Sequence, residues 1–485
     1  MASYTPLTAP VPSKDMPKGI PYIITNEAAE RFSFYGMKGI LIIFMTKYLL
    51  DANGAEDFMT PDEAKANYHL FTTAVYFTPI MGALLADYFL GKYKTILWLS
   101  IVYCAGHLAL ALDETRFGLA LGLGLIALGS GGIKPCVSAH VGDQFGKTNG
   151  HLLERVFGWF YFSINLGAFV STLLTPWLLA NYGPHVAFGI PGALMGLATL
   201  FFWMGRKVFI HIPPGGKAFL KETLSKEGLS SLGRLAIIYA FVAMFWALFD
   251  QTGSAWVLQA DHPLMNRHFL GIEWLPSQIQ SINPIMIMVF IPIFNGVRTI
   301  GWPGLYPLTS RAWALTPLRK ISVGFFITVP AFLIPSWIES QLAAGVEVNI
   351  AWQLFAYLVL TAAEVLVSIT CLEFSYTQAP KTMKSLVLAL FLMSVSLGNA
   401  FVAVVNMFIQ NPDGTSKLAG ADYYNFFAVC MLFTAVVFIP VAMAYKEKRY
   451  LQDEGRDSSN GSSDGPPEPP PMVSSLDTET VLDEG

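Results

Sequence analysis

The sequence predicts an all-α polytopic membrane protein with 12 transmembrane helices in two six-helix bundles. Three observations predict this class. Only 13% of the 485 residues are charged, whereas a soluble domain carries about 25%. The mean hydropathy is +0.49, and long apolar stretches recur along the chain. Basic residues also gather on one side of the membrane when those stretches are taken as spans.

A membrane-spanning helix needs about 20 mostly apolar residues. Twelve stretches meet this length, and turn-forming sequences such as Asn181–Pro184 and Asn411–Gly414 separate them. The expected spans are 22–50, 68–90, 95–112, 117–141, 155–180, 186–205, 234–258, 279–297, 320–340, 350–372, 385–409 and 424–445. The first span differs from the others because it contains Glu27, Glu30 and Arg31.

The orientation follows from the basic residues, since cytoplasmic loops of membrane proteins carry an excess of Lys and Arg. With the N-terminus placed inside, 22 of the 30 basic residues fall on the cytoplasmic side and 4 on the other face. The remaining 4 lie within helices: Arg31, Lys38, Lys47 and Lys134. A wrong number of helices would invert the loops that follow the error and remove this excess of basic residues on one side. We therefore expect a multi-pass protein of the cell (inner or plasma) membrane with both termini in the cytoplasm.

The longest internal polar stretch, 206–233, divides the spans into six plus six, a layout of two-bundle transporters. The tail is rich in Ser, Gly, Pro and acidic residues, a composition typical of disorder. The expected units are a cytoplasmic N-terminal tail (1–19), a first six-helix bundle (20–205), a cytoplasmic linker (206–233), a second six-helix bundle (234–446) and a disordered cytoplasmic tail (447–485).

The first span carries a dense group of charges. Each ionisable residue at the centre of a span costs at least about 2.5 kcal/mol, so it needs a partner, water or a function. Glu27, Glu30 and Arg31 are followed by Tyr35 and Lys38 on further turns of one broad face. An internally neutralised patch that only packs the helix is the alternative. A structural pair needs one acid and one base, however, so this density favours a functional site.

Other ionisable residues stand alone in their spans. Lys134 follows the small residues 129–132, which would let a neighbouring helix approach closely. Asp250 and Glu364 are lone acids in the second half. His69 opens the second span, and histidine is the side chain whose proton affinity lies nearest physiological pH. For His69, an interfacial hydrogen-bonded histidine is an equally simple alternative.

These charges differ in sign between the two halves. The first half contributes the excess cations Arg31, Lys38 and Lys134, and the second half contributes Asp250 and Glu364. A site between the bundles would be cationic on one wall and anionic on the other. That polarity suits a zwitterion with a carboxylate at one end and an ammonium group at the other, such as a short peptide.

Motifs along residues 20–445 carry a family resemblance. They are Glu27-x-x-Glu30-Arg31-Phe32 with Tyr35-Gly36, Gly82 to Gly91, Gly131 to Ser138, Phe160 to Gly167, Trp246 to Gln251, Ile282-Asn283-Pro284 and Leu372 to Pro380. Together they resemble the proton-dependent oligopeptide transporter family of the major facilitator superfamily. Several of them, including Gly131 to Ser138, are similar to the mammalian peptide transporters. The stretch from Gly82 to Gly91 alone would indicate only the superfamily.

The resemblance implies the major facilitator fold and proton-coupled symport of di- and tripeptides by alternating access between the bundles. It implies that the peptide carboxylate is held by Arg31, Lys38 and Lys134. The amino terminus would be held by Glu364 with Asn165 and Asn283, and the pocket would be lined by Tyr35, Tyr76, Trp246 and Ser368. The resemblance also implies that protons are coupled by Glu27, Glu30, His69 and Asp250. No catalytic residue, metal or cofactor is expected, with protons as the coupling ion. The expected partners are peptides, protons and the lipid bilayer, without nucleic acid or an obligate protein partner.

Other functions fit the sequence less well. The same fold with another small anion, such as nitrate, is the nearest alternative, and the intact Glu27, Glu30 and Arg31 set argues against it. A peptide-sensing membrane receptor would carry a folded soluble output domain, and a membrane hydrolase would show a nucleophile or metal motif such as GxSxG or HExxH. Three departures from the mammalian pattern stand out. Arg234 resembles an arginine that pairs with an aspartate in the mammalian members, but Asn295 stands at the matching position. The loop at 341–349 is too short for a large extracellular domain, and Phe391 stands where a pocket Trp is expected.

Overall fold

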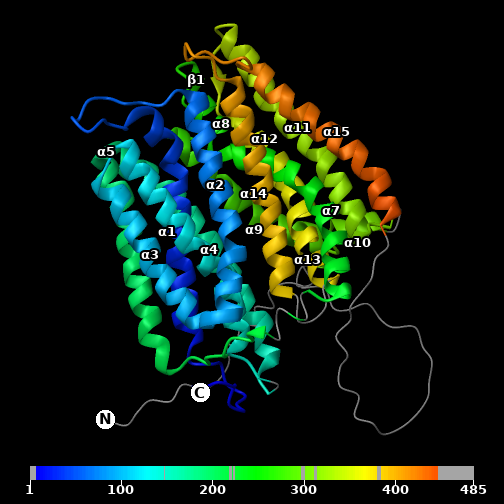
Figure 1. The fold of residues 1–485 in the computed structure, drawn as a ribbon. Helices are drawn as coiled ribbons and strands as arrows, with labels where there is room; N and C mark the ends of the chain where they lie inside the picture. Colours follow the sequence, from blue (N-terminus) through cyan, green and yellow to red (C-terminus); the bar gives the residue numbers. More distant parts are fainter. Residues whose placement is uncertain are drawn as a thin grey trace, which may run out of the picture.

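The computed structural model describes residues 7–146, 148–217, 221, 224–296, 301–310, 314–378 and 384–445. The predicted tail at 447–485 and part of the predicted linker lie outside these residues. Long helices stand side by side, and the lower end of the molecule in Figure 1 holds the start of α1 (Ile20–Lys47), drawn in dark blue. The upper end holds strand β1 (Met265–Asn266). Upper and lower refer below to these two ends.

The first half of the chain folds into α1 and the long helices that follow it. These are α2 (Pro61–Leu84), which continues as a π-helical segment (Leu85–Leu90), α3 (Lys92–Leu112), α4 (Arg116–Asp143) and α5 (Leu153–Met204). Threonine side chains fix where α2 and α4 begin. The hydroxyl of Thr60 accepts a hydrogen bond from the amide of Glu63, and that of Thr115 accepts one from the amide of Gly118, which satisfies amides that the helix itself cannot pair.

Helix α5 contains two spans. Its 52 residues would extend about 78 Å at 1.5 Å per residue, far beyond a hydrocarbon core of about 30 Å. The backbone at Gly183 has a φ of 80°, which favours glycine, and Pro184 follows it. The chain therefore turns back at this point, and the break predicted at Asn181–Pro184 is confirmed.

The described residues of the second half form both long and short helices and four two-residue strands. The helices are α7 (Lys226–Phe249), α8 (Ala255–Ala260), α9 (Ile282–Asn295), α10 (Leu305–Ser310), α11 (Pro317–Ala343), α12 (Ala351–Glu364), α13 (Thr370–Thr377), α14 (Lys384–Ile409) and α15 (Ala421–Ala444). The strands are β1, β2 (His268–Phe269), β3 (Ile272–Glu273) and β4 (Val348–Asn349). Strands β1 and β4 pair in parallel and β2 and β3 pair antiparallel, which gives two small sheets. The sequence did not predict these sheets, because a two-residue strand is too short to show an alternation of apolar and polar residues.

Ten helical runs in the described part are long and apolar enough to cross a membrane. One of them, Gly150–Lys207, covers both spans of α5. Helix α1 is 28 residues long, and only its charged residues keep it out of this set. With α5 divided at Gly183 and α1 added, the helices match the twelve predicted spans. The prediction of an all-helical polytopic membrane fold is confirmed.

The buried apolar side chains form two large clusters, one for each half of the chain. One cluster draws on residues between Ile20 and Phe209, with Val257 as its member from the second half. The other draws on residues between Leu235 and Phe438. Helices α2 and α14 lie side by side at the centre of Figure 1 and join the halves. The functional side chains therefore belong to two bodies that each have their own core.

Polar contacts between the halves concentrate in the upper part of the molecule. Helix α1 rises toward the upper end and α2 descends from it, so the later residues of α1 and the earlier residues of α2 lie high. Among the described residues the contacts are Lys47–Asp261, Thr60–Gln410, Lys38–Asp250, His69–Asn399, His69–Ser254, Gly39–Gln280, Thr73–Ser396 and Leu173–Gln278. The upper part of the interface is thus closed by specific hydrogen bonds and ion pairs.

Candidate functional site

The charged group predicted on α1 forms a compact buried cluster. Arg31 donates from Nε to Glu27 at 2.7 Å and lies 3.3 Å from a carboxylate oxygen of Glu30. Lys134 reaches the same cluster from α4, with its Nζ 3.9 Å from Glu30. The two acids are almost completely buried, at 1% and 0% exposed. Buried ions require partners, and here two carboxylates face two cations.

Close helix packing places Lys134 in this cluster. A methyl group added to Gly131 would overlap Thr78 of α2, so α4 can approach α2 only because this position is glycine. The hydroxyl of Thr78 donates to the carbonyl of Ala127 at 2.7 Å and ties the two helices together. The ammonium group of Lys134 then lies 3.9 Å from the ring centroid of Phe34. The close approach predicted from the small residues is present in the structure.

A second polar group lies in the other half, around Glu364 at the end of α12. Asn283 donates to the carboxylate of Glu364 at 2.7 Å and to the hydroxyl of Thr361 at 3.1 Å. Tyr35 and Tyr161 of the first half lie close enough to Glu364 to interact with it electrostatically. An acid of the second half therefore lies within electrostatic range of tyrosine hydroxyls of the first half. This arrangement can hold an ammonium group between the halves.

The helix that carries Glu364 changes its winding at the site. Residues Val365–Ile369 form a π-helical segment directly after α12, and such single turns often occur at functional sites. Ser368 lies within this segment and is half-buried. The extra residue per turn shifts the side chains that follow Glu364 around the helix axis.

The remaining predicted pocket residues have defined surroundings. Trp246 packs edge-on against Phe391, with ring centroids 6.4 Å apart, and its buried indole Nε1 has no hydrogen-bond partner among the described residues. Asn165 donates to the backbone carbonyl of Tyr161 at 2.9 Å. Tyr76 is half-buried and lies 5.5 Å from the Lys134 ammonium group.

A third group of polar residues lies nearer the upper end and crosses the interface. Lys38, predicted to hold a substrate carboxylate, donates to Asp250 at 2.8 Å. The other carboxylate oxygen of Asp250 accepts from Asn399 at 2.7 Å. The side-chain oxygen of Asn399 lies 2.7 Å from Nδ1 of His69, and the hydroxyl of Ser254 lies 2.8 Å from Nε2 of the same ring. In this conformation Lys38 therefore belongs to a network that joins the halves.

Sequence reasoning missed Asn399 and Ser254. Both are uncharged polar residues in apolar surroundings, where a hydrogen bond to the backbone of the same helix is the usual explanation. The sequence feature that comes closest to marking Asn399 is the glycine that precedes it, Gly398. A methyl group added there would overlap the carbonyl of Ala243 in α7, so α14 and α7 touch at this level and Asn399 is brought to Asp250.

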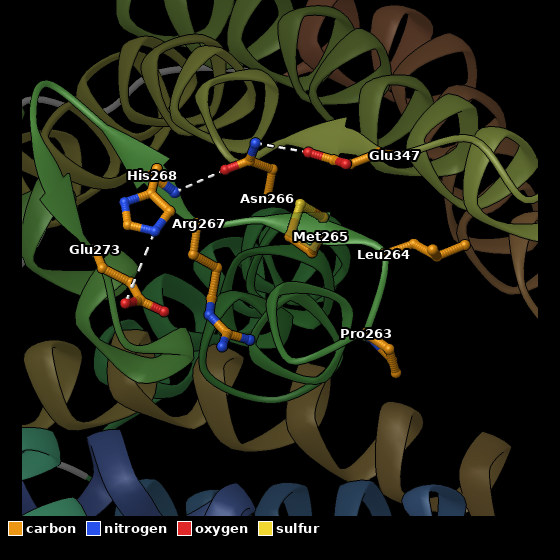
Figure 2. A pocket seen from close by; sticks show the side chains of 8 residues that line it. All are labelled: Pro263, Leu264, Met265, Asn266, Arg267, His268, Glu273 and Glu347. Carbon is orange, nitrogen blue, oxygen red and sulfur yellow. Dashed lines mark hydrogen bonds and ion pairs between the residues drawn. The ribbon is translucent and has the colours of Figure 1, made fainter.

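A surface hollow at the upper end lies apart from these groups (Figure 2). It has a volume of about 320 Å³ and is lined by Pro263, Leu264, Met265, Asn266, Arg267, His268, Glu273 and Glu347. Asn266 donates to Glu347 at 2.6 Å, and His268 lies 3.8 Å from Glu273. The polar side chains of this hollow therefore contact one another at the surface, whereas the two acids of the α1 cluster are buried. Among the described residues, no group of three or more His, Cys, Asp or Glu is placed to hold a metal ion.

Comparison with known proteins agrees with this geometry. The chain matches a family model described as the POT family over residues 93–226 and 220–424. Solute carrier family 15 member 2 of Homo sapiens is 36% identical over 377 residues, which cover 67% of this chain and 49% of that protein. Peptide transporter family 1 of Drosophila melanogaster is 34% identical over 383 residues, covering 69% and 49%. The chain spans about half the length of these relatives.

Solved structures show the same fold. The crystal structure of an auto-inhibited POT family peptide transporter has a TM-score of 0.78 and 34% identity, covering 89% of this chain and 98% of that chain. The in meso crystal structure of the POT family transporter PepTSo has a TM-score of 0.77 and 36% identity, covering 88% and 98%. The chain therefore belongs to the POT family of proton-dependent oligopeptide transporters. The resemblance seen in the motifs is confirmed, and the family is one of multi-pass membrane transporters rather than enzymes.

Proposed function

We propose that this protein imports di- and tripeptides together with protons by alternating access between its two halves. The observation that carries this proposal is the placement of the charged groups. Arg31 and Lys134 of the first half lie beside two buried acids, while Glu364 of the second half is held by Asn283. A peptide zwitterion would place its carboxylate on the cationic side and its ammonium group at Glu364.

Proton coupling follows from the two acids beside one arginine. When Glu27 and Glu30 are both ionised, they compete with a substrate carboxylate for Arg31. Protonation of one acid removes that competitor and frees the guanidinium for the peptide. Because the proton and the peptide then favour the same state, the two are taken up together. The coupling requires no cofactor other than the proton.

We further infer that the lower end and both termini face the cytoplasm of the cell membrane. The excess of basic residues in the loops at this end supports the assignment. The upper end would then face outward, and the hydrogen bonds between the halves would close the outer side in this conformation.

The test uses purified protein in proteoliposomes with a panel of dipeptides. Each terminal contact is a hydrogen bond to a charged group, worth about 1.5–3 kcal/mol, so its loss lowers affinity roughly 10- to 150-fold. Lys134→Gln should weaken uptake of a free dipeptide far more than that of its C-terminal amide. Glu364→Gln should weaken a free dipeptide far more than its N-acetyl form.

A matched control is Glu339→Gln, because Glu339 is an acid of the second half that instead pairs with Gln259 at 2.9 Å. It should change free and blocked peptides equally. Equal losses in the Lys134 and Glu364 variants would mean that these residues only hold the helices together. Uptake of nitrate without uptake of any dipeptide would support the other-anion alternative, and saturable peptide binding without counterflow would support a receptor.

A further inference from the structure

The hydrogen bonds of Asn399 fix which way its side-chain amide faces. Its Nδ2 atom lies 2.9 Å from the backbone carbonyl of Val395 and 2.7 Å from Asp250. A backbone carbonyl can only accept a hydrogen bond. The group that faces it must be the NH2 group, so the amide oxygen faces Nδ1 of His69 at 2.7 Å. The usual ambiguity between the two ends of an amide is thereby removed.

This amide orientation determines the tautomer of the neutral imidazole. The oxygen of Asn399 is an acceptor, so Nδ1 of His69 must carry the hydrogen. The lone pair of the neutral ring then lies on Nε2, which accepts from the hydroxyl of Ser254 at 2.8 Å. His69 is completely buried, at 0% exposed, and each of its two ring nitrogens has one of these side chains as its partner.

We propose that Asn399 is a positioning residue for proton uptake at His69, which it holds as the Nδ1–H tautomer so that the proton binds at Nε2 opposite Ser254. The inference rests on the proposed function, in which His69 takes part in proton coupling. When the proton binds, Nε2–H donates to the oxygen of Ser254. The hydroxyl hydrogen of Ser254 then turns away, and the carbonyl of Gln251, 3.5 Å from the hydroxyl, is an acceptor on that side. One proton enters, and no other group changes its proton count.

The same amide links the imidazole to the ion pair between the halves. Asn399 contacts His69 of α2 with its oxygen and Asp250 with its nitrogen, and Asp250 pairs with Lys38 of α1. The other charged or titratable groups facing His69 are Lys65 and Tyr68, both on α2. A positive charge on His69 therefore arises beside two lysines and one carboxylate. Asn399 transmits this change to the contact that closes the upper part of the interface.

The test is the tautomer itself, measured on the full chain in lipid nanodiscs with 15N-labelled histidine. At a pH where His69 is neutral, the nitrogen shifts distinguish Nδ1–H from Nε2–H. The His69→Gln variant identifies the resonances of this ring among the 8 histidines. The wild type is expected to show Nδ1–H. Asn399→Leu should convert it to Nε2–H or to a mixture.

Two further variants keep the test decisive. Asn406→Leu removes a second buried asparagine of α14, which contacts Tyr423 instead, and should leave His69 unchanged. Asn399→Asp keeps an acceptor oxygen and should preserve Nδ1–H, even if Asn399→Leu does not fold.

The outcomes separate this proposal from the proposed function. An Nε2–H tautomer in the wild type or in Asn399→Asp would overturn the role of Asn399, and so would an unchanged tautomer in a folded Asn399→Leu variant. The spectra need no transport. Protein that shows the expected tautomers but transports no dipeptide would leave the positioning role standing and reject the transport proposal alone.

Discussion

The upper and lower parts of the interface use their buried charges differently. In the upper part, Lys38 of the first half pairs with Asp250 of the second, so opposite charges join the two bodies. Lower down, Arg31 and Lys134 pair with Glu27 and Glu30 of their own half. A charge satisfied within one body can exchange its partner for a substrate without parting the halves. A charge satisfied across the interface changes its partner only when the halves separate.

The largest effect is expected at the upper ion pair. Lys38→Met leaves Asp250 as a buried carboxylate without its cation, which costs about 3–5 kcal/mol. The upper part should therefore open, and spin labels on the exposed loops 52–55 and 270–271 should move apart in pulsed distance measurements. The double variant Lys38→Met with Asp250→Leu removes both charges, so the upper part of its interface should close again in part. Unchanged distances in the single variant would show that the ion pair does not hold the halves together.

The next effect separates coupling from binding in the α1 cluster. Glu27→Gln and Glu30→Gln each remove one titratable competitor for Arg31. Uptake driven by an acid-outside gradient should fall by roughly two orders of magnitude, in line with about 3 kcal/mol for a hydrogen bond to a charged group. Counterflow, which needs no net proton movement, should be spared to a greater extent. Acid-stimulated uptake at the wild-type rate in both variants would contradict this coupling scheme.

The smallest effect is expected at the edge of the upper part. Lys65 of α2 lies 3.8 Å from the ring centroid of Tyr423 in α15 and pairs with Asp62 at 2.7 Å. A cation over an aromatic ring contributes about 0.5–2 kcal/mol. Tyr423→Leu should widen the same spin-label distances slightly, whereas Tyr423→Phe keeps the ring and should not. Equal behaviour of the two variants would assign the effect to the lost hydroxyl, which Asn406 contacts.

Sequence patterns predicted the parts of the molecule that depend on local chemistry. The spans followed from apolar length, and the turn at Gly183 followed from its Pro neighbour. Lys134 and Glu364 stood out because a lone charge in an apolar helix is costly. The partner of Lys38 did not stand out, since Asp250 lies 212 residues away and several acids could satisfy a lysine. Asn399 was missed for a similar reason, because an uncharged amide leaves no sign of its partner in the sequence.

The pairing of β1 with β4 has a practical consequence for imaging the protein. Met265 and Asn266 lie beside Val348 and Asn349, so the short connection between α11 and α12 is anchored to a neighbouring loop. Gly345 has a φ of 76°, and Val346 is 46% exposed, which marks a surface turn that tolerates insertion. A rigid marker domain inserted between these two residues would project from the upper end in a nearly fixed orientation. Electron microscopy could use it as a fiducial for a 53.2 kDa chain whose mass lies largely within the membrane.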